Sequence, residues 1–235
     1  MARMPRLAVS GQPHLVVQRG GGEPVFRDDD DHRRYLNDVH QAARSCNVAV
    51  HAYCVLADCA MLLVSPRDAA DLGRFMQRVN RRYVLGFHRR HGGSGPLWAG
   101  RFAATAIEPE RYLLACIVMI EQAPVRAGFV ARAAQWPWSS ARHHIGHRDG
   151  GASWGVTVHP CWWRLGNTPF EREARHAIEL GSLLREEQVN ELLRAARSGW
   201  PLGSAAFIAE AARANDRPAQ PRPRGRPRQN QASGT

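Results

Sequence analysis

The sequence contains no lysine, so all 32 of its cationic side chains are arginines. Codon usage in a GC-rich genome explains this bias more simply than selection for guanidinium chemistry. The lack of lysine does not exclude polyanion binding, because arginine pairs bidentately with phosphate and stacks on bases. Against 21 acidic residues, the arginines leave a formal net charge of +11 and a pI of about 10.7. This charge favours a nucleic-acid partner, whose phosphates supply sequence-independent affinity.

Cysteine is scarce, and its spacing excludes the usual cysteine-based frameworks. The chain has the five cysteines Cys46, Cys54, Cys59, Cys116 and Cys161. Their odd number and the lack of a C-x-x-C pair fit neither a disulfide framework nor a zinc ribbon. We expect most of them to be small buried apolar residues.

Long hydrophobic runs are also missing. No stretch approaches the roughly 20 apolar residues that a membrane span requires, and no apolar segment follows the basic residues at the N-terminus. We therefore expect no membrane partner and a cytoplasmic location. With 44% hydrophobic and 23% charged residues, the chain has the composition of a folded globular protein. Its 235 residues allow one domain of ordinary size plus an extension.

The first part of the chain predicts a strand, a helix and two further strands. HLVVQRG, which starts at His14, has strand character and ends at the glycines 20–22. Residues 25–47 begin acidic and then turn helical, and an acidic start suits a helix N-terminus. AVHAYCVLA and CAMLLVS are apolar and β-rich, with little more than Ala57 and Asp58 between them, so we predict two tightly joined strands.

A helix, a strand and a second helix are predicted next. Residues 71–91 place large apolar side chains at helical spacing, which predicts an amphipathic helix. These side chains are Leu72, Phe75, Met76, Val79, Tyr83 and Phe87. LWAGRFAATAIEP, at 97–109, predicts a strand, and ERYLLACIVMIEQA, at 110–123, predicts an apolar helix halted by Pro124.

The first six elements match the ferredoxin-like split βαβ arrangement, an α+β fold in which helices cover one face of an antiparallel sheet. We predict that this main domain spans residues 1–149, including a segment rich in Trp and Arg after residue 125. Residues 150–214 then form a small helical extension. Residues 215–235 are almost entirely Pro, Arg, small and polar residues, which predicts a disordered basic tail.

Several motifs occur in a fixed order between about residues 12 and 145. They are QRGGGEPVF, HAYCVLADCAMLLV, GRFMQRVNRRYVLGFHRRHGGSGPLWAGRF, ERYLLAC, PVRAGFV and WPWSSAR. This combination resembles the REP-associated tyrosine transposases of bacteria, which are single-tyrosine enzymes with a His-hydrophobic-His (HUH) motif. PLGSAAF at 201–207 and the basic tail resemble the C-terminal extension of one branch of that family.

The resemblance implies a transposase of single-stranded DNA. In that family, two histidines of a His-x-His motif on a central strand bind a divalent ion such as Mg²⁺, and an Asn or Gln commonly completes the site. Side chains at i and i+2 of a strand face the same way, so both can hold one metal. The metal polarises the scissile phosphate, and a tyrosine on the last helix attacks it to form a 5′-phosphotyrosine.

This chain departs from the family at each of these positions. Aligned on the motifs, the two histidine positions hold Cys59 and Met61, the tyrosine position holds Met119 and the Asn position holds Ala123. A thioether gives no stable phosphate ester, a methyl group cannot coordinate, and Mg²⁺ prefers oxygen ligands. Cys59 with Met61 would suit only a soft metal, and two buried apolar side chains are the simpler interpretation. We therefore predict that no catalytic residue, metal ligand or cofactor remains.

Replacement groups and other histories stay open as alternatives. Tyr112 lies seven residues before Met119, about 10 Å away along the same helical face, which favours packing over nucleophilic attack. Other groups near the expected site are His14, His51, Asp58 and Glu121. Glu121 also occurs at this position in many active members of the family that the chain resembles. The chain is then either a DNA-binding relative without catalysis, an active nuclease or transposase with replacement ligands, or a decayed mobile-element product without a role.

The features expected to bind DNA are arginines. Five of them lie opposite the apolar stripe of the helix at 71–91, namely Arg74, Arg78, Arg81, Arg82 and Arg89. They could follow a phosphate backbone, or form an ordinary solvated surface. Arg19 and Arg101 occupy motif positions that the resemblance associates with DNA handling. The expected partner is DNA, either single-stranded or in a hairpin, and the oligomeric state is left open.

Two further features are less specific. Arg224 and Arg226 flank Gly225 in the tail, which resembles the core of an AT-hook for the minor groove, although nonspecific phosphate binding fits equally well. Six tryptophans could stack on unpaired bases, but we expect most of them to fill the core. They are Trp136, Trp138, Trp154, Trp162, Trp163 and Trp200.

Overall fold

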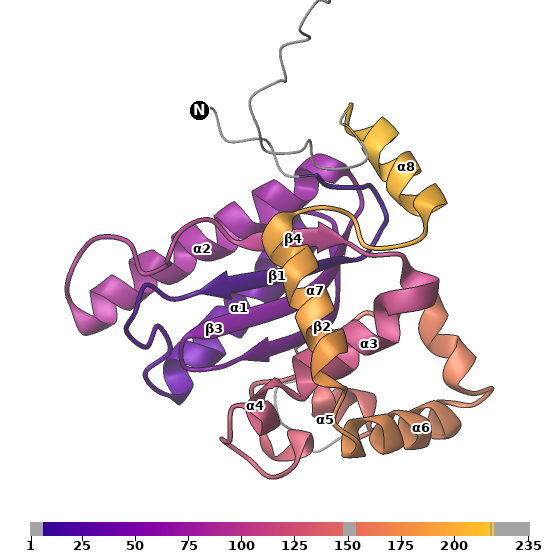
Figure 1. Ribbon diagram of the computed structural model, residues 1–235. Coiled ribbons are helices and arrows are strands. Elements are labelled where there is room, and N and C mark those ends of the chain that lie inside the picture. The colour runs from indigo at the N-terminus through magenta and orange to yellow at the C-terminus, as the bar shows by residue number, and fades with distance from the viewer. Residues whose placement is uncertain (1–6, 148–153, 217, 219–235) are drawn as a thin grey trace, which may run out of the picture.

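The computed structural model describes residues 7–147, 154–216 and 218. Its first six elements are β1 (His14–Arg19), α1 (Asp29–Ser45), β2 (Val48–Val55), β3 (Cys59–Pro66), α2 (Ala69–His91) and β4 (Ala103–Ala106). The four strands form one antiparallel sheet in the order β2-β3-β1-β4 (Figure 1). This arrangement confirms the predicted α+β fold class, with α1 and α2 as its two crossover helices.

The chain after β4 is helical. Its elements are α3 (Pro109–Glu121), α4 (Ala123–Arg126), the 3-10 helix η1 (Ala133–Gln135), α5 (Ala141–His144), the 3-10 helix η2 (Pro160–Leu165), α6 (Pro169–Gly181), α7 (Glu186–Ser198) and α8 (Ala205–Ala214). Pro124 does not only stop a helix, because it lies in the first turn of α4, where proline is tolerated. Within the described residues, every helix is too short or too polar to cross a membrane.

β4 is shorter than the strand predicted at 97–109. Only Ala103–Ala106 pairs with β1. Leu97, Trp98 and Ala99 instead bond with the backbone of residues 19–21, and Gly100 has a φ of +146°. That backbone angle suits glycine and breaks the regular ladder before β4 begins.

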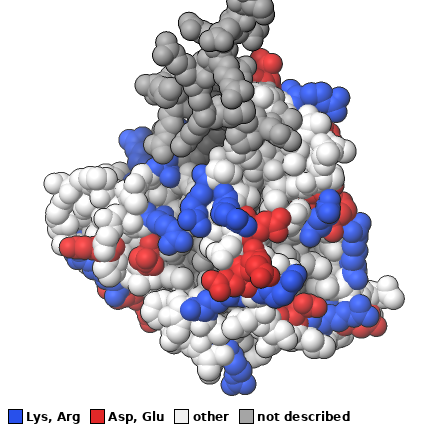
Figure 2. All heavy atoms as spheres, in the orientation of Figure 1, with Lys and Arg blue, Asp and Glu red and all other residues white. Residues whose placement is uncertain are grey.

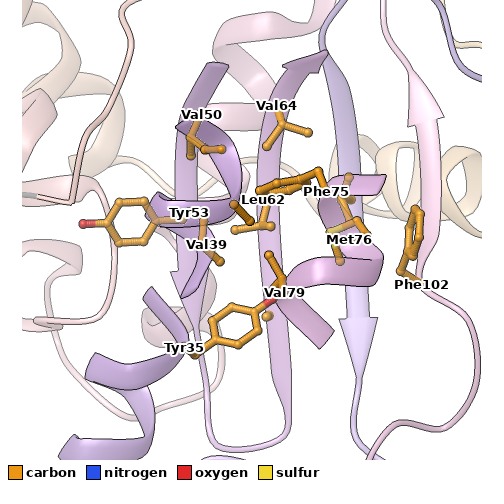
Figure 3. Packing of buried hydrophobic residues seen from close by; sticks show 14 of the residues in the cluster. Tyr35, Val39, Val50, Tyr53, Leu62, Val64, Phe75, Met76, Val79 and Phe102 are labelled. Atoms are coloured by element: carbon orange, nitrogen blue, oxygen red, sulfur yellow. The ribbon is translucent and has the colours of Figure 1, made fainter. Parts of the chain in front are cut away.

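α1 and α2 cover one face of the sheet, which we call the first face. Val16, Leu62 and Val64 point from β1 and β3 into this layer. Figure 3 shows how Tyr35 and Val39 from α1, and Phe75, Met76 and Val79 from α2, pack against them. The six apolar side chains predicted along the second helix are all buried here. The apolar residues that recur every 3.6 residues in α2 and the inward-facing residues of the strands therefore pack into one core.

The opposite face, the second face, is covered as well. Leu15, Val17, Met61 and Leu63 point from β1 and β3 into it. Both strands are apolar at successive positions, so each carries apolar side chains on both faces of the sheet. α3 packs on β2 and β3, whereas α7 packs on β4 and β1 (Figure 1). α7 contributes the buried residues Leu192 and Ala196. A helix beyond the predicted main domain thus completes the second core, since strands that are apolar on both sides must be buried on both.

Later segments of the chain pair with the two edge strands. On the β2 edge, the Val55 amide donates to Trp138 O and the Ser140 amide donates to Tyr53 O, both at 2.9 Å. On the β4 edge, the Leu202 amide donates to Ala106 O at 2.9 Å. These bonds occupy backbone groups that an exposed edge would offer to another chain.

Candidate nucleic-acid interface

The four positions at which the sequence departs from the transposase pattern meet in one place. Cys59 and Met61 project from β3 into the second core, Met119 projects from α3, and Ala123 begins α4. All four belong to the same buried hydrophobic cluster, with exposed fractions of 4%, 8%, 2% and 7%. The fold therefore brings the two residues of β3 together with two residues that follow them by 58 to 64 positions, a separation that no local pattern spans.

The thiols at this site are protonated at neutral pH. Burial raises the pKa of the Cys59 thiol to about 11, although the charge of Arg19 acts in the opposite direction. Burial also raises the pKa of the Cys54 thiol well above its ordinary range. Metals are bound by thiolates rather than thiols. A thiol, a thioether and a methyl group, all in apolar surroundings, do not fit the divalent ion of the resembled family.

Tyr112 is held against α7. Its hydroxyl donates a hydrogen bond of 3.2 Å to Oε1 of Glu191. Burial and the adjacent Glu191 carboxylate raise the pKa of the Tyr112 phenol, so the phenolate needed for attack on phosphorus is disfavoured.

His14 and His51 are both engaged in hydrogen bonds as neutral rings. His14 accepts from the Val9 amide at 3.1 Å through Nε2, and its Nδ1 donates to Gln12 O at 2.8 Å. His51, at the β2 bulge, donates from Nδ1 to Thr157 O at 2.7 Å and accepts from the Ser65 hydroxyl at 2.8 Å. Burial lowers the pKa of each to about 4. Asp58 is exposed in the turn between β2 and β3.

Glu121 is buried in a cluster that sequence reasoning did not foresee. Its carboxylate accepts from the Ser140 hydroxyl and from His144 Nδ1, both at 2.5 Å, and from His176 Nε2 at 2.7 Å. Burial alone would raise the pKa of Glu121, but the two imidazoles hold it well below its usual range. His144 and His176 lie 23 and 55 residues from Glu121, so no spacing rule could have linked them.

The five predicted arginines of α2 are all exposed on the side of the helix that faces away from the sheet. Three have partners: Arg74 pairs with Asp71 at 3.5 Å, Arg82 pairs with Asp38 at 3.0 Å, and Arg78 donates to the Ser45 hydroxyl at 2.5 Å. Within the described residues, Arg81 and Arg89 form no ion pair. These two guanidinium groups are the most available to an added phosphate.

An open groove of about 550 Å³ runs between α1 and α2. Its charged lining consists of Arg33, Arg34, Arg82, Arg89, Arg90, Asp30 and Asp38. Sequence reasoning had named only Arg82 and Arg89 from this set. Arg33, Arg82 and Arg90 form ion pairs with aspartates of α1 or its N-cap. Among the described residues no ion pair involves Arg34 or Arg89, so these two arginines supply the positive charge along the groove that suits a phosphate chain. The contribution of α1 could be seen only after the two helices were packed side by side.

Arg19 and Arg101 come together at one end of the sheet, although 82 residues separate them. The Ala99 amide donates to Arg19 O at 3.0 Å, and the Gln18 amide group donates to Gly100 O at 3.2 Å. Both arginines are exposed. Arg19 also pairs with Cys59 in the β1–β3 register, so it lies at the rim of the second face. The predicted arginines thus form two groups, one on the outer side of α2 and one at the sheet end.

The other predicted features differ in outcome. Arg224 and Arg226 lie outside the described residues. Of the six tryptophans, Trp163 is exposed and the other five are buried or partly buried, as expected for core residues.

Figure 2 shows that on the face carrying α7, basic and acidic side chains both occur over the middle of the surface.

In comparison with known proteins, the chain shows a likeness of fold. No protein-family model matches the sequence, and no curated protein matches it. One similar solved structure is that of a REP-associated tyrosine transposase bound to a REP hairpin, with a TM-score of 0.50 and 15% identity, covering 68% of this chain and 96% of that chain. Another is a candidate transposase from Deinococcus radiodurans, with a TM-score of 0.36 and 16% identity, covering 48% of this chain and 90% of that chain. The first likeness shows a shared fold.

Proposed function

We propose that this protein is a DNA-binding relative of single-strand DNA transposases that has lost DNA cleavage. The observation that carries the proposal is the composition of the second core where β3 meets α3. The two positions for metal ligands, the position for the nucleophile and the position for the assisting amide hold Cys59, Met61, Met119 and Ala123 in one buried apolar cluster.

The loss of chemistry follows from these side chains. Cleavage in the resembled family needs imidazole or oxygen ligands for a divalent ion and a hydroxyl that can attack phosphorus. The cluster offers a protonated thiol, two thioethers and a methyl group. The phenol of Tyr112, on the same helix as Met119, is hydrogen-bonded to Glu191. We therefore derive no catalytic step for this chain.

DNA binding is supported by the arginines and by the fold. The groove between α1 and α2 presents Arg34 and Arg89, and the sheet end presents Arg19 and Arg101. The transposase of similar fold is described with a bound REP hairpin. By this analogy we propose that the present chain binds hairpin DNA with single-stranded flanks, in the cytoplasm. We also propose that residues 1–149 form the transposase-like unit and that 150–214 extend it.

The binding arm of the test uses a fluorescent hairpin of the REP type, titrated with purified protein at several salt concentrations. We expect micromolar or tighter binding that weakens as salt rises, because bound counterions are released. The double variant Arg82→Ala/Arg89→Ala should weaken binding and lower the salt slope by about one per lost phosphate contact. Arg213→Ala, which removes an exposed arginine of α8, is the control and should bind like the parent protein. Weak binding that ignores both salt and the double variant would contradict a role in DNA handling.

The catalytic arm uses the same hairpin with Mg²⁺ or Mn²⁺, followed by denaturing electrophoresis. We expect intact DNA and no protein–DNA adduct. A cut strand, or a covalent complex that survives denaturation, would overturn the proposed loss of cleavage. It would favour an enzyme with replacement ligands.

A further inference from the structure

The cluster around Glu121 joins three helices that are distant in sequence. Glu121 ends α3, His144 ends α5 and His176 lies in α6. All three side chains are at least 96% buried. One ligand atom from each lies within 4.8 Å of the others. Two imidazole nitrogens and a carboxylate oxygen are a ligand set that divalent first-row metals, zinc above all, bind readily.

A buried carboxylate needs a positive partner. Burial of an isolated carboxylate is costly unless the charge is paired or coordinates a metal. Among the residues that the structure describes, the partners of Glu121 are the Ser140 hydroxyl and the two imidazoles, and no arginine is among them. The compensating charge must therefore come from a proton on an imidazole or from a metal ion at the same place.

The packing of α6 favours a metal ion as the source of this positive charge. His176 is the only buried residue of this 13-residue helix. Two of its three large apolar side chains point outward, with Phe170 76% and Ile178 71% exposed, and Leu180 is partly buried. Hydrophobic contact therefore contributes little to holding α6, and such weakly packed segments are commonly tied down by a metal or a disulfide. Among the described residues, the hydrogen bonds between α3 and α6 run from His176 to Glu121, and from Gln122 to the carbonyls of Glu179 and Leu180 at the end of α6.

The surroundings also suit a structural metal site. The Trp162 ring packs on both imidazoles, with ring centroids 4.5 Å from His144 and 4.6 Å from His176, so it shields them from water. The Ser140 hydroxyl donates to the carboxylate at 2.5 Å, as the groups that orient metal ligands do.

We propose that Glu121, His144 and His176 bind a structural divalent transition-metal ion of the zinc class, which fastens α5 and α6 to α3. Without the ion, the two imidazoles donate their protons to the carboxylate. On loading, the ion displaces the protons on His144 Nδ1 and His176 Nε2. Each displaced proton either moves to the other nitrogen of its ring or, where that nitrogen already carries one, is released to solvent, so both rings coordinate as neutral imidazoles. This site is separate from the metal site of the resembled family, whose ligand positions are Cys59 and Met61.

The test measures metal directly. The full chain is purified without chelators or an affinity tag, and its metal content is determined by mass spectrometry. The chelator-treated protein is then titrated with Co²⁺ and Zn²⁺, following visible absorption and thermal unfolding. We expect about one zinc per chain, Co²⁺ bands that Zn²⁺ abolishes, and a higher unfolding temperature with metal because the ion binds only the folded state.

Matched variants locate the site. His176→Gln and His144→Gln should each weaken Co²⁺ binding by more than about 100-fold, and Ser140→Ala by about 10-fold, as for outer groups that orient ligands. His143→Gln is the control, because His143 is the exposed neighbour of His144. Circular dichroism identifies any variant that fails to fold. If the histidine variants do not fold, the Co²⁺ affinity of Ser140→Ala tests whether the metal binds at this cluster.

Two results would overturn the proposal. One is a folded protein without stoichiometric metal and without Co²⁺ bands. The other is metal binding that the His176, His144 and Ser140 variants leave unchanged. In either case the cluster is held by hydrogen bonds and a proton alone. These outcomes are independent of hairpin binding, so they leave the proposed function intact.

Discussion

The guanidinium group of Arg34 on α1 lies against Gly86 on α2, where a Cβ atom would overlap it. Both residues line the groove between the two helices. The absence of a side chain at position 86 is thus what lets Arg34 reach across α2. The relationship offers a way to move one charge of the groove without removing it.

Gly86→Ala should weaken hairpin binding by about threefold, because Arg34 must leave its place in the groove. A factor of this size corresponds to the loss of one exposed ion pair worth about 0.7 kcal/mol. The free energy of unfolding should stay the same or rise by up to about 1 kcal/mol, since alanine favours helix over glycine. Fluorescence titration and chemical denaturation measure the two quantities.

The matched control is Gly73→Ala in the same helix. A Cβ atom at Gly73 meets nothing within 4 Å. This variant should gain stability and keep the affinity of the parent protein. If both glycine variants bind hairpin DNA equally well, the groove does not contribute to binding, whereas a loss with Arg19→Ala or Arg101→Ala would still support binding at the sheet end.

Met119→Ala should cost about 2 to 5 kcal/mol of unfolding free energy, the usual range for truncating a buried methionine. Met119 is 2% exposed in the second core, in the position that the resemblance assigns to the nucleophile. Met119→Leu keeps the volume and should cost less than about 1.5 kcal/mol. Urea denaturation gives both values. Hairpin affinity measured well below the unfolding midpoint should not change, and a specific loss of affinity in Met119→Leu would show that position 119 contacts DNA.

Stability should fall as the pH is lowered from about 6.5 towards 4, in part through His14 and His51. Burial lowers the pKa of each ring to about 4 from an ordinary value of 6.5, so the unfolded chain binds more protons in this interval. Each histidine then contributes about 3 kcal/mol that is present above pH 6.5 and lost as the pH falls to 4. Chemical denaturation between pH 4.5 and 7.5 measures the slope.

His14→Gln provides the comparison for this slope. It should be less stable than the parent protein at pH 7, because it loses a fitted hydrogen-bonding ring, but its stability should depend less on pH. An unchanged slope in this variant would mean that His14 is not buried as a neutral ring.

The helices and strands of the main unit follow from local patterns. The period of Leu72, Phe75, Met76 and Val79 predicts α2 and the face that it buries, because a helix returns to the same face every 3.6 residues. The start of β4 was not predicted correctly. It depends on a contact between residues 97–99 and the loop after β1 rather than on the side chains of β4 itself.

The candidate sites also have one part that the sequence predicts and one part that only the fold shows. Motif positions are enough to name Cys59, Met61 and Met119 and to say which chemistry their side chains cannot perform. Neighbouring residues, however, do not reveal that α7 would cover the second face, that Arg34 would cross Gly86, or that His144 and His176 would converge on Glu121. Such contacts join residues tens of positions apart, and their stability comes from burial and charge pairing that exist only after the chain has folded.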